Sequence, residues 1–114
     1  MVKNINKKPG NTPLLENRNI EETFNISKVY IKDESKNPFG TIKDRRNFDI
    51  FQEANRLKVD KLVLITSGNN GHSLSQFAKS SPVKVVCVVD KNLNQDIKTK
   101  LKKEVYQVLE LNLQ

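Results

Sequence analysis

Two short segments of this sequence combine residue types and spacings that could do chemistry, and the first surrounds Lys43. Thr41 and Asp44 are three positions apart, a spacing typical of a capping box in which Thr41 is the N-cap of a helix. Lys43 would then lie in the first helical turn, where the positive end of the helix dipole disfavours a charged ammonium. A neutral lysine amine is the form that makes a Schiff base with a carbonyl group. The alternative is an ordinary surface lysine whose ammonium is solvated at a helix start.

The second segment is Thr66-Ser67-Gly68-Asn69-Asn70-Gly71, which follows an apolar run and precedes a helical pattern. Its glycines allow a ligand to approach the backbone closely, and free N–H groups at a helix start favour a carboxylate or a phosphate. The spacing matches neither the dinucleotide-binding motif nor the phosphate loop. Taken alone, the segment indicates either an anion site or an ordinary tight turn between a strand and a helix.

The sequence gives little support for other kinds of site. His72 is the only histidine, and we interpret it as a polar residue at a helix start rather than as a catalytic group. Cys87 is the only cysteine, so it cannot form a disulfide within the chain, and it has no neighbours with the spacing of zinc ligands. We therefore expect no metal site and a reducing, cytoplasmic location.

The elements that must position these segments alternate between strands and helices. Apolar runs of strand length predict strands at 29–31, 61–66, 83–89 and 105–111. Helical spacing predicts helices over about 42–57, between Gly71 and Pro82, and over 93–101. This order is typical of right-handed βαβ units, so we expect an α/β fold with a small parallel four-stranded sheet and helices on its faces. Ligands of such sheets bind beyond the carboxyl ends of the strands, where residues 67–71 would lie.

Length and charge exclude several classes of protein. The 114 residues suffice for one core, and we expect a flexible basic tail over 1–10 followed by one domain over 11–114. No run approaches the roughly 18 apolar residues of a membrane span, and the N-terminus lacks the apolar segment of a secretory signal. The net charge of +7 comes from the tail and from residues 91–103, and the chain has no tryptophan for stacking on bases. We expect neither a nucleic-acid partner nor a membrane.

Four segments resemble successive signatures of one family, the fold-type II pyridoxal-phosphate enzymes. The matching segments are Asn11-Thr12-Pro13-Leu14-Leu15, Tyr30-Ile31-Lys32-Asp33-Glu34, Asn37-Pro38-Phe39-Gly40-Thr41-Ile42-Lys43-Asp44-Arg45 and Thr66-Ser67-Gly68-Asn69-Asn70-Gly71. They occur in the order of the family and with matching separations, which is far more specific than any one of them. The family includes threonine synthase, cysteine synthase, threonine and serine dehydratases and the tryptophan synthase beta chain.

The resemblance implies a role for each matching residue of the two segments. Lys43 resembles the catalytic lysine that binds pyridoxal phosphate covalently and then moves the α-proton of the substrate. Asn69 resembles the asparagine whose side chain meets the 3-hydroxyl of the cofactor. Ser67, Gly68 and Asn70 resemble the loop that holds the α-carboxylate of the substrate, in agreement with the anion site that the turn itself suggests.

The resemblance also implies that part of the site lies elsewhere. The family places a glycine-rich phosphate-binding loop well downstream in a larger domain, and nothing after Val83 resembles it. We therefore expect the smaller domain of a two-domain enzyme, truncated before the larger domain. The implied activity is that of an amino-acid lyase or synthase that eliminates or replaces a group at the β or γ carbon. A threonine-synthase-like reaction comes first, with a threonine or serine dehydratase or a cysteine synthase as alternatives. The matches at 30–34 and 44–45 are expected to be architectural.

Two hypotheses of other classes remain at this point. The chain could be a non-catalytic truncated or split product that needs a partner chain for the rest of the site, and it could also form a homodimer. A receiver-like or flavodoxin-like binding module is compatible with the alternation of elements, although the chain lacks the acidic strand-end cluster of receivers.

Overall fold

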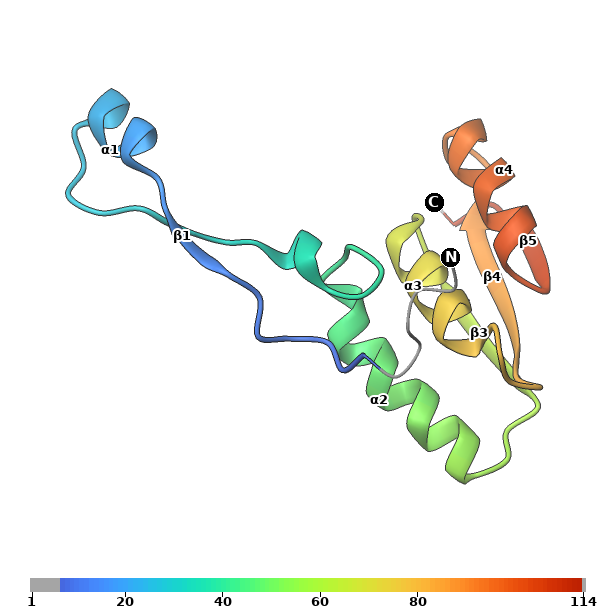
Figure 1. The fold of residues 1–114 in the computed structure, drawn as a ribbon. Coiled ribbons are helices and arrows are strands. Elements are labelled where there is room, and N and C mark those ends of the chain that lie inside the picture. The colour runs from blue at the N-terminus through green and yellow to red at the C-terminus, as the bar shows by residue number, and fades with distance from the viewer. Residues whose placement is uncertain (1–6, 114) are drawn as a thin grey trace.

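The chain folds into a body and a projecting arm. The computed structural model describes residues 7–113, so residues 1–6 of the predicted basic tail lie outside the described residues. Its elements are β1 (Leu14–Glu16), α1 (Arg18–Phe24), β2 (Tyr30–Lys32), the 3-10 turn η1 (Glu34–Lys36), α2 (Lys43–Arg56), β3 (Lys61–Ile65), α3 (Asn69–Ala78), β4 (Lys84–Asp90), α4 (Gln95–Glu104) and β5 (Gln107–Leu111). Figure 1 shows β1, α1 and β2 forming the arm, while α2 and all later elements form the body.

The body is built on a parallel sheet with the strand order β3-β4-β5. The register sets Val63 opposite Val86 and Val88 opposite Leu109. The connections through α3 and α4 both step in the same direction along the sheet, so right-handed crossovers place both helices on one face. These two helices contact each other, and α2 packs on α3 (Figure 1). The predicted α/β class with parallel pairing is confirmed.

The prediction of four strands in this sheet is wrong. The expected strand at 29–31 forms β2, but it pairs antiparallel with β1, with Leu15 opposite Ile31, and the parallel sheet of the described residues has three strands. Antiparallel neighbours need only a short connection, which α1 provides, whereas a parallel neighbour needs a crossover that packs on the sheet. Because α2 packs on α3 instead, the segment before α2 does not reach the edge of the sheet.

The predicted helices beside the sheet are present, but within the described residues the two crossover helices lie on the same face. Side chains of β4 that point toward α3 and α4, such as Val85 and Cys87, are buried. On the opposite face Val63 and Ile65 of β3 are 63% and 68% exposed, and Leu111 of β5 is exposed too. The same-sense order of the three strands explains this, since each crossover returns on the same side.

Aromatic rings fill the space between α2 and α3. Phe77 of α3 is 1% exposed, and its ring centroid lies 4.8 Å from that of Phe39, 5.7 Å from that of Phe48 and 6.4 Å from that of Phe51. Phe48 and Phe51 lie on one face of α2, as the helical period requires. This cluster fixes α2 against α3 and so sets where the N-terminus of α2 lies.

Candidate functional site

Lys43 is the first residue of α2, but the helix start differs from the predicted capping box. The Thr41 hydroxyl accepts a hydrogen bond from the Lys43 N–H at 3.2 Å, two residues on rather than three. The Asp44 carboxylate accepts from the Phe39 N–H at 2.7 Å instead of returning to Thr41. The capping box is therefore wrong, because the turn before the helix folds back and presents a different N–H to this carboxylate. The Lys43 side chain itself is exposed.

The loop between β3 and α3 is shorter than predicted, because α3 begins before Gly71. α3 begins at Asn69, so both asparagines lie in the first helical turn. The Thr66 hydroxyl accepts hydrogen bonds from the N–H groups of Gly68 and Gly71 at 3.0 and 3.1 Å. Gly68 has a φ of 137°, which side chains rarely adopt. Thr66 thus stabilises the turn through its side chain, a role that the sequence analysis did not predict.

Gly71 is required by close packing rather than by its backbone angles. A Cβ atom at this position would lie 2.6 Å from Cys87 Sγ and 3.0 Å from atoms of Leu101 and Thr66. The first turn of α3 therefore lies directly on β4 and α4, with no room for a methyl group. This packing fixes the position of the asparagines that precede Gly71.

Hydrogen bonds join the start of α2 to the first turn of α3. Arg46 Nη2 donates to Asn70 Oδ1 at 2.7 Å, and Asn47 Nδ2 donates to the Asn70 carbonyl oxygen at 3.1 Å. Lys43 lies about one helical turn before these donors, and Asn69 immediately precedes their acceptor. The structure therefore brings together the two segments that the sequence singled out. Sequence reasoning missed Arg46 and Asn47, although their spacing of three and four from Lys43 was a usable signal.

The first turn of α3 has the properties of an anion site. The N–H groups of Asn69 and Asn70 have no hydrogen-bond acceptor within residues 7–113, as expected for the first turn of a helix. The positive end of the helix dipole adds to their attraction for an anion. Ser67 and Asn69 are exposed, and the turn lies at the carboxyl end of β3. The geometry is compatible with the roles predicted for Ser67, Gly68, Asn69 and Asn70, which stay predictions.

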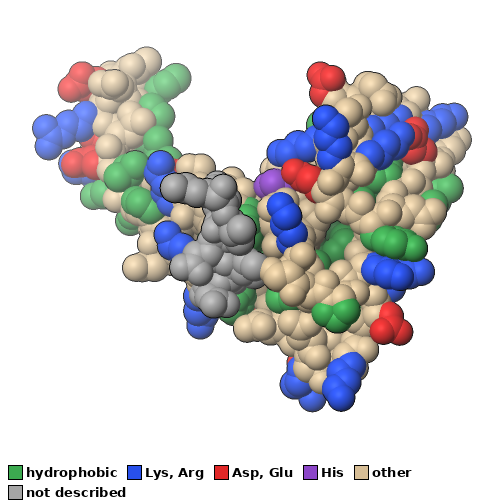
Figure 2. Space-filling view, turned by 45° about the vertical axis from the view of Figure 1, so that its right-hand side comes forward, with side chains coloured by type: hydrophobic (Ala, Val, Ile, Leu, Met, Phe, Trp, Pro, Cys, Tyr) green, Lys and Arg blue, Asp and Glu red, His purple; other side chains and the backbone are tan. Residues whose placement is uncertain are grey.

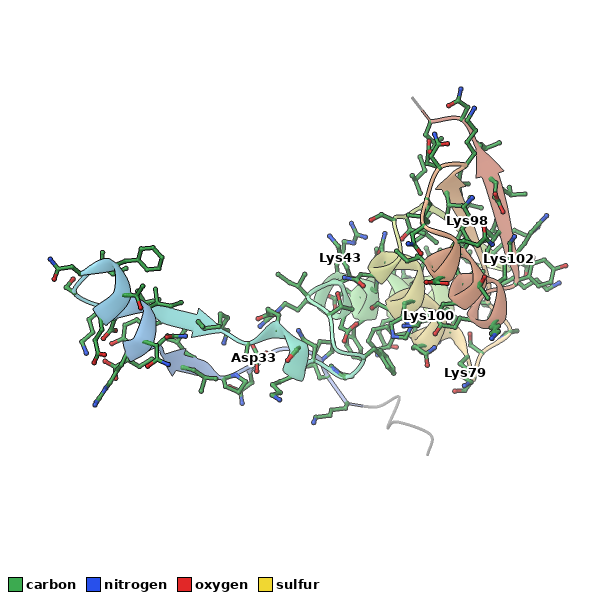
Figure 3. All side chains as sticks on the ribbon, turned by 90° about the horizontal axis from the view of Figure 1, so that it is seen from above. Asp33, Lys43, Lys79, Lys98, Lys100 and Lys102 are labelled. Atoms are coloured by element: carbon green, nitrogen blue, oxygen red, sulfur yellow. The ribbon has the colours of Figure 1, made fainter. Side chains whose placement is uncertain are left out.

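Figure 3 shows where Lys43 lies in the molecule. It is at the end of α2 where the arm joins the body, apart from Lys98, Lys100 and Lys102 of α4 (Figure 3). Two of those lysines, Lys98 and Lys102, pair with Glu110 at 2.9 Å each. Figure 2 shows other Lys and Arg side chains scattered over the surface, with a group over the part of the body that carries α4. The position of Lys43 thus distinguishes it from the lysines of α4.

A network of charged and polar groups ties the arm to the start of α2. Arg45 donates to both Glu34 oxygens at 2.7 and 2.9 Å, while Thr12 Oγ1 and Asn37 Nδ2 each donate to this carboxylate at 2.7 Å. The hydrogen bonds from Arg45, followed by those from Thr12 and Asn37, lower the pKa of the Glu34 carboxyl to about 2. The network supports the architectural role expected for the matches at 30–34 and 44–45, and it recruits two residues that sequence reasoning left unassigned.

His72 and Cys87 lie behind the site. His72 Nδ1 lies 2.9 Å from Glu104 Oε2, which links α3 to α4, a contact that the sequence interpretation missed. Cys87 is buried, and burial, with a smaller effect of the Glu104 charge, raises the pKa of its thiol to about 11. Among residues 7–113 no group of three or more His, Cys, Asp or Glu side chains could hold a metal ion. None of the helices in that same range is long and apolar enough to span a membrane.

Comparison with known proteins identifies the family. The family described as Pyridoxal-phosphate dependent enzyme matches residues 5–110 of this chain. The chain belongs to this family. The cofactor of the family is pyridoxal phosphate, as the four sequence signatures imply.

Curated relatives in this family catalyse different reactions. Threonine synthase of Methanocaldococcus jannaschii is 35% identical over 80 residues, which cover 70% of this chain and 19% of that protein. Cysteine synthase of Staphylococcus aureus is 33% identical over 105 residues, which cover 89% of this chain and 34% of that protein. The 2-amino-4-ketopentanoate thiolase beta subunit of Acetoanaerobium sticklandii is 33% identical over 86 residues, which cover 69% of this chain and 18% of that subunit.

Solved structures confirm the fold over nearly the whole chain. The crystal structure of O-ureido-L-serine synthase matches with a TM-score of 0.79 and 26% identity, covering 95% of this chain and 35% of that one. A lysine-to-alanine variant of that enzyme with O-ureido-L-serine bound matches with a TM-score of 0.77 and 25% identity. The chain thus spans between 18% and 35% of the length of these proteins.

The residues at the candidate site fit pyridoxal phosphate chemically. An aldehyde needs an accessible amine, which Lys43 offers, and the ring hydroxyl needs a polar partner, which the exposed Asn69 amide can be. The two free N–H groups at the start of α3 suit an anionic group of the cofactor or of the substrate. All four glycines precede residue 72, so a second glycine-rich loop for the phosphate is not found after the turn.

Proposed function

We propose that this chain carries the lysine-bearing part of a pyridoxal-phosphate site that acts on an amino acid. The reaction we propose is elimination or replacement at the β or γ carbon of the substrate. When bound, the cofactor supplies a sink for the electrons that proton loss leaves on the α carbon. The observation that carries the proposal is the pair of hydrogen bonds from Arg46 and Asn47 to Asn70, which hold the helix start of Lys43 beside the turn of Asn69.

The roles we propose follow the chemistry of each group. Lys43 would bind the cofactor through its amine until the amino group of the substrate takes its place on the cofactor. The released, neutral Nζ would then take the α-proton, since a neutral amine is both nucleophile and base. Asn69 orients the ring through its side-chain amide. Ser67, Gly68 and Asn70 bind the substrate carboxylate, which the free N–H groups and the dipole of α3 favour over a neutral group.

The site assignment is tested by covalent trapping. The chain is incubated with pyridoxal phosphate, reduced with borohydride and digested, and the modified lysines are mapped by mass spectrometry. Lys43 is expected to be modified ahead of the other lysines, and Lys43→Arg should abolish that product. Lys79→Arg is the matched control, because Lys79 is an exposed lysine at the opposite end of α3. Modification spread evenly over many lysines would contradict the assignment.

For the reaction itself we propose threonine-synthase-like chemistry first. The threonine synthase and cysteine synthase relatives support this choice and one alternative, a cysteine synthase. The other alternative, a threonine or serine dehydratase, rests on the resemblance of the four sequence segments alone. A panel of O-phosphohomoserine, O-acetylserine supplied with sulfide, serine and threonine separates these reactions, because each gives a different product. Turnover of O-acetylserine alone would exclude the first choice and favour the cysteine synthase.

A second proposal is that the chain becomes active only with a partner that supplies the remainder of the site. It is supported by the coverage, since the match reaches 34% of the cysteine synthase and 35% of the O-ureido-L-serine synthase chain. The test adds the remaining part of the Staphylococcus aureus cysteine synthase as a separate chain and measures turnover. Activity of the 114 residues alone, as a monomer or as a homodimer, would refute this proposal. We also propose a cytoplasmic location, which the unpaired and buried Cys87 supports.

A further inference from the structure

The interface between α2 and α3 changes character along its length. Aromatic rings fill the part around Phe77, whereas the part nearest Lys43 is polar. There, within the described residues, three side-chain atoms are buried without a hydrogen-bond partner: Asp44 Oδ1, Asn47 Oδ1 and Ser73 Oγ. Their residues are each 0% exposed. Buried polar atoms in folded proteins nearly always have a partner, so three of them in one interface require an explanation.

Hydrogen bonds and ring contacts indicate that Ser73 faces the part of α2 that carries Asp44 and Asn47. Asn47 donates to the carbonyl of Asn70, which is one helical turn before Ser73. Asp44 accepts from the N–H of Phe39, whose ring packs at 4.8 Å on Phe77, one turn after Ser73. Residues three and four positions apart lie on one face of a helix, so Ser73 shares the α2-facing side of α3 with its two neighbours.

The hydrogen-bonding capacity of the three atoms identifies what fits between them. The Asn47 amide is oriented by its donation to a carbonyl, so its Oδ1 is an acceptor that needs a donor. Asp44 Oδ1 is a second acceptor, and the Ser73 hydroxyl is a donor. A single water molecule donates two hydrogen bonds and accepts at least one, which matches this set.

We propose that one water molecule binds between α2 and α3, donating to Asp44 Oδ1 and Asn47 Oδ1 and accepting from Ser73 Oγ. The water joins the turn of α2 that follows Lys43 to the face of α3 that carries Asn70. The buried water stabilises the relative position of the two site segments within the interface, whereas the hydrogen bond from Arg46 to Asn70 does so at the exposed surface. A sodium or potassium ion is the competing occupant, since all three ligand atoms are oxygens.

The water is tested directly by nuclear magnetic resonance on the unmodified, isotope-labelled chain. Protons of a water that stays bound for more than about a nanosecond should show cross-relaxation with the Asn47 side-chain amide and with the Ser73 N–H. This cross-relaxation should have the same sign as that between protons within the protein. The amide of Asn55, which faces the open groove lined by Gln52 and Ser80, is the control and should show only fast-exchanging solvent. Absence of the long-lived signal at Asn47 and Ser73 would overturn the proposal.

A double-mutant cycle tests whether the atoms act through one shared molecule. Ser73→Ala and Asn47→Ala should couple by about threefold or more in the unfolding equilibrium constant, because either change removes a partner of the same water. Ser75→Ala is the matched control, since Ser75 is buried on the same helix but donates to the His72 carbonyl at 2.7 Å, and it should not couple to Asn47. Independent effects at Ser73 and Asn47 would contradict a shared water. If Asn47→Ala does not fold, Asn47→Ser replaces it in the cycle.

The identity of the occupant is tested by exchanging the cations of the buffer. The unfolding midpoint is measured in sodium, potassium and choline chloride at equal ionic strength. The same midpoint in all three supports water. An unfolding midpoint that rises in sodium or potassium would show a cation site and overturn the proposal, provided that the rise disappears in Asp44→Asn.

Discussion

The body and the arm of this molecule are stabilised by different interactions. In the body Phe77, Leu101 and Cys87 are at most 1% exposed, so apolar burial dominates. In the arm none of the residues of β1, α1 and β2 is buried, and Phe24 is 69% exposed. The arm is attached through the carboxylate of Glu34, which Arg45 and two neutral donors surround. The body should therefore respond to changes in packing, and the arm to changes in charge.

The largest effect is expected from Phe77→Ala in the body. This change removes the ring that three other phenylalanines contact and leaves a cavity between α2 and α3. The free energy of unfolding should fall by about 3–5 kcal/mol, as for other buried aromatic residues. Urea or guanidinium unfolding followed by circular dichroism measures the change. A loss below about 1 kcal/mol would show that the cluster does not hold α2 on α3.

A smaller loss in the free energy of unfolding is expected from Gly71→Ala at the candidate site. The new methyl group meets Cys87 Sγ at 2.6 Å, so α3 must shift or the core must open. The expected cost is about 1–3 kcal/mol, typical of overpacking in a core. The double variant with Cys87→Ala should recover part of this loss, because it removes the nearest atom. Equal stability of the single variant and the parent chain would contradict the close packing.

The attachment of the arm should depend on pH, and the direction follows from Glu34. Its pKa is lowered to about 2 in the folded chain, so its contribution to stability is complete above the usual carboxyl value of about 4.3. The contribution is lost as the pH falls from there toward 2, where the carboxylate becomes protonated. Unfolding measured between pH 6 and pH 2 should show this loss, and Glu34→Gln should show less of it. The matched control is Glu53→Gln, since Glu53 pairs with Arg56 within α2 and does not touch the arm.

The smallest effect is expected from Phe24→Ala in the arm. Phe24 is a large apolar side chain like Phe77, but most of its surface is already in water. The stability of the body should change by no more than about 0.5 kcal/mol, as for other surface substitutions. The same unfolding experiment measures it beside Phe77→Ala. A large loss would show that the arm folds back on the body and would remove the contrast between the two regions.

Local patterns in the sequence predicted most of the body. The three strands and the three helices predicted for the body are all present, because their apolar spacing has a clear period and each forms within one segment. The strand at 29–31 is also present, but its partner Leu15 was not found, since a strand of three exposed residues leaves no periodic signal. The start of α2 was predicted one residue too early, and the predicted capping box is wrong because the partner of Asp44 depends on how the preceding turn folds.

The sequence by itself determined which residues could form the site and to which family they belong. The types and spacing of residues around Lys43 and Asn69 are properties of continuous segments, and four such segments in order are specific. Only the tertiary structure decided how these segments meet. The contacts of Asn70 with Arg46 and Asn47, of Gly71 with Cys87, and of Glu34 with Arg45 join residues far apart in the chain. Such contacts follow from the packing of α2 on α3 and of the arm on α2, which depends on many side chains at once and has no local period.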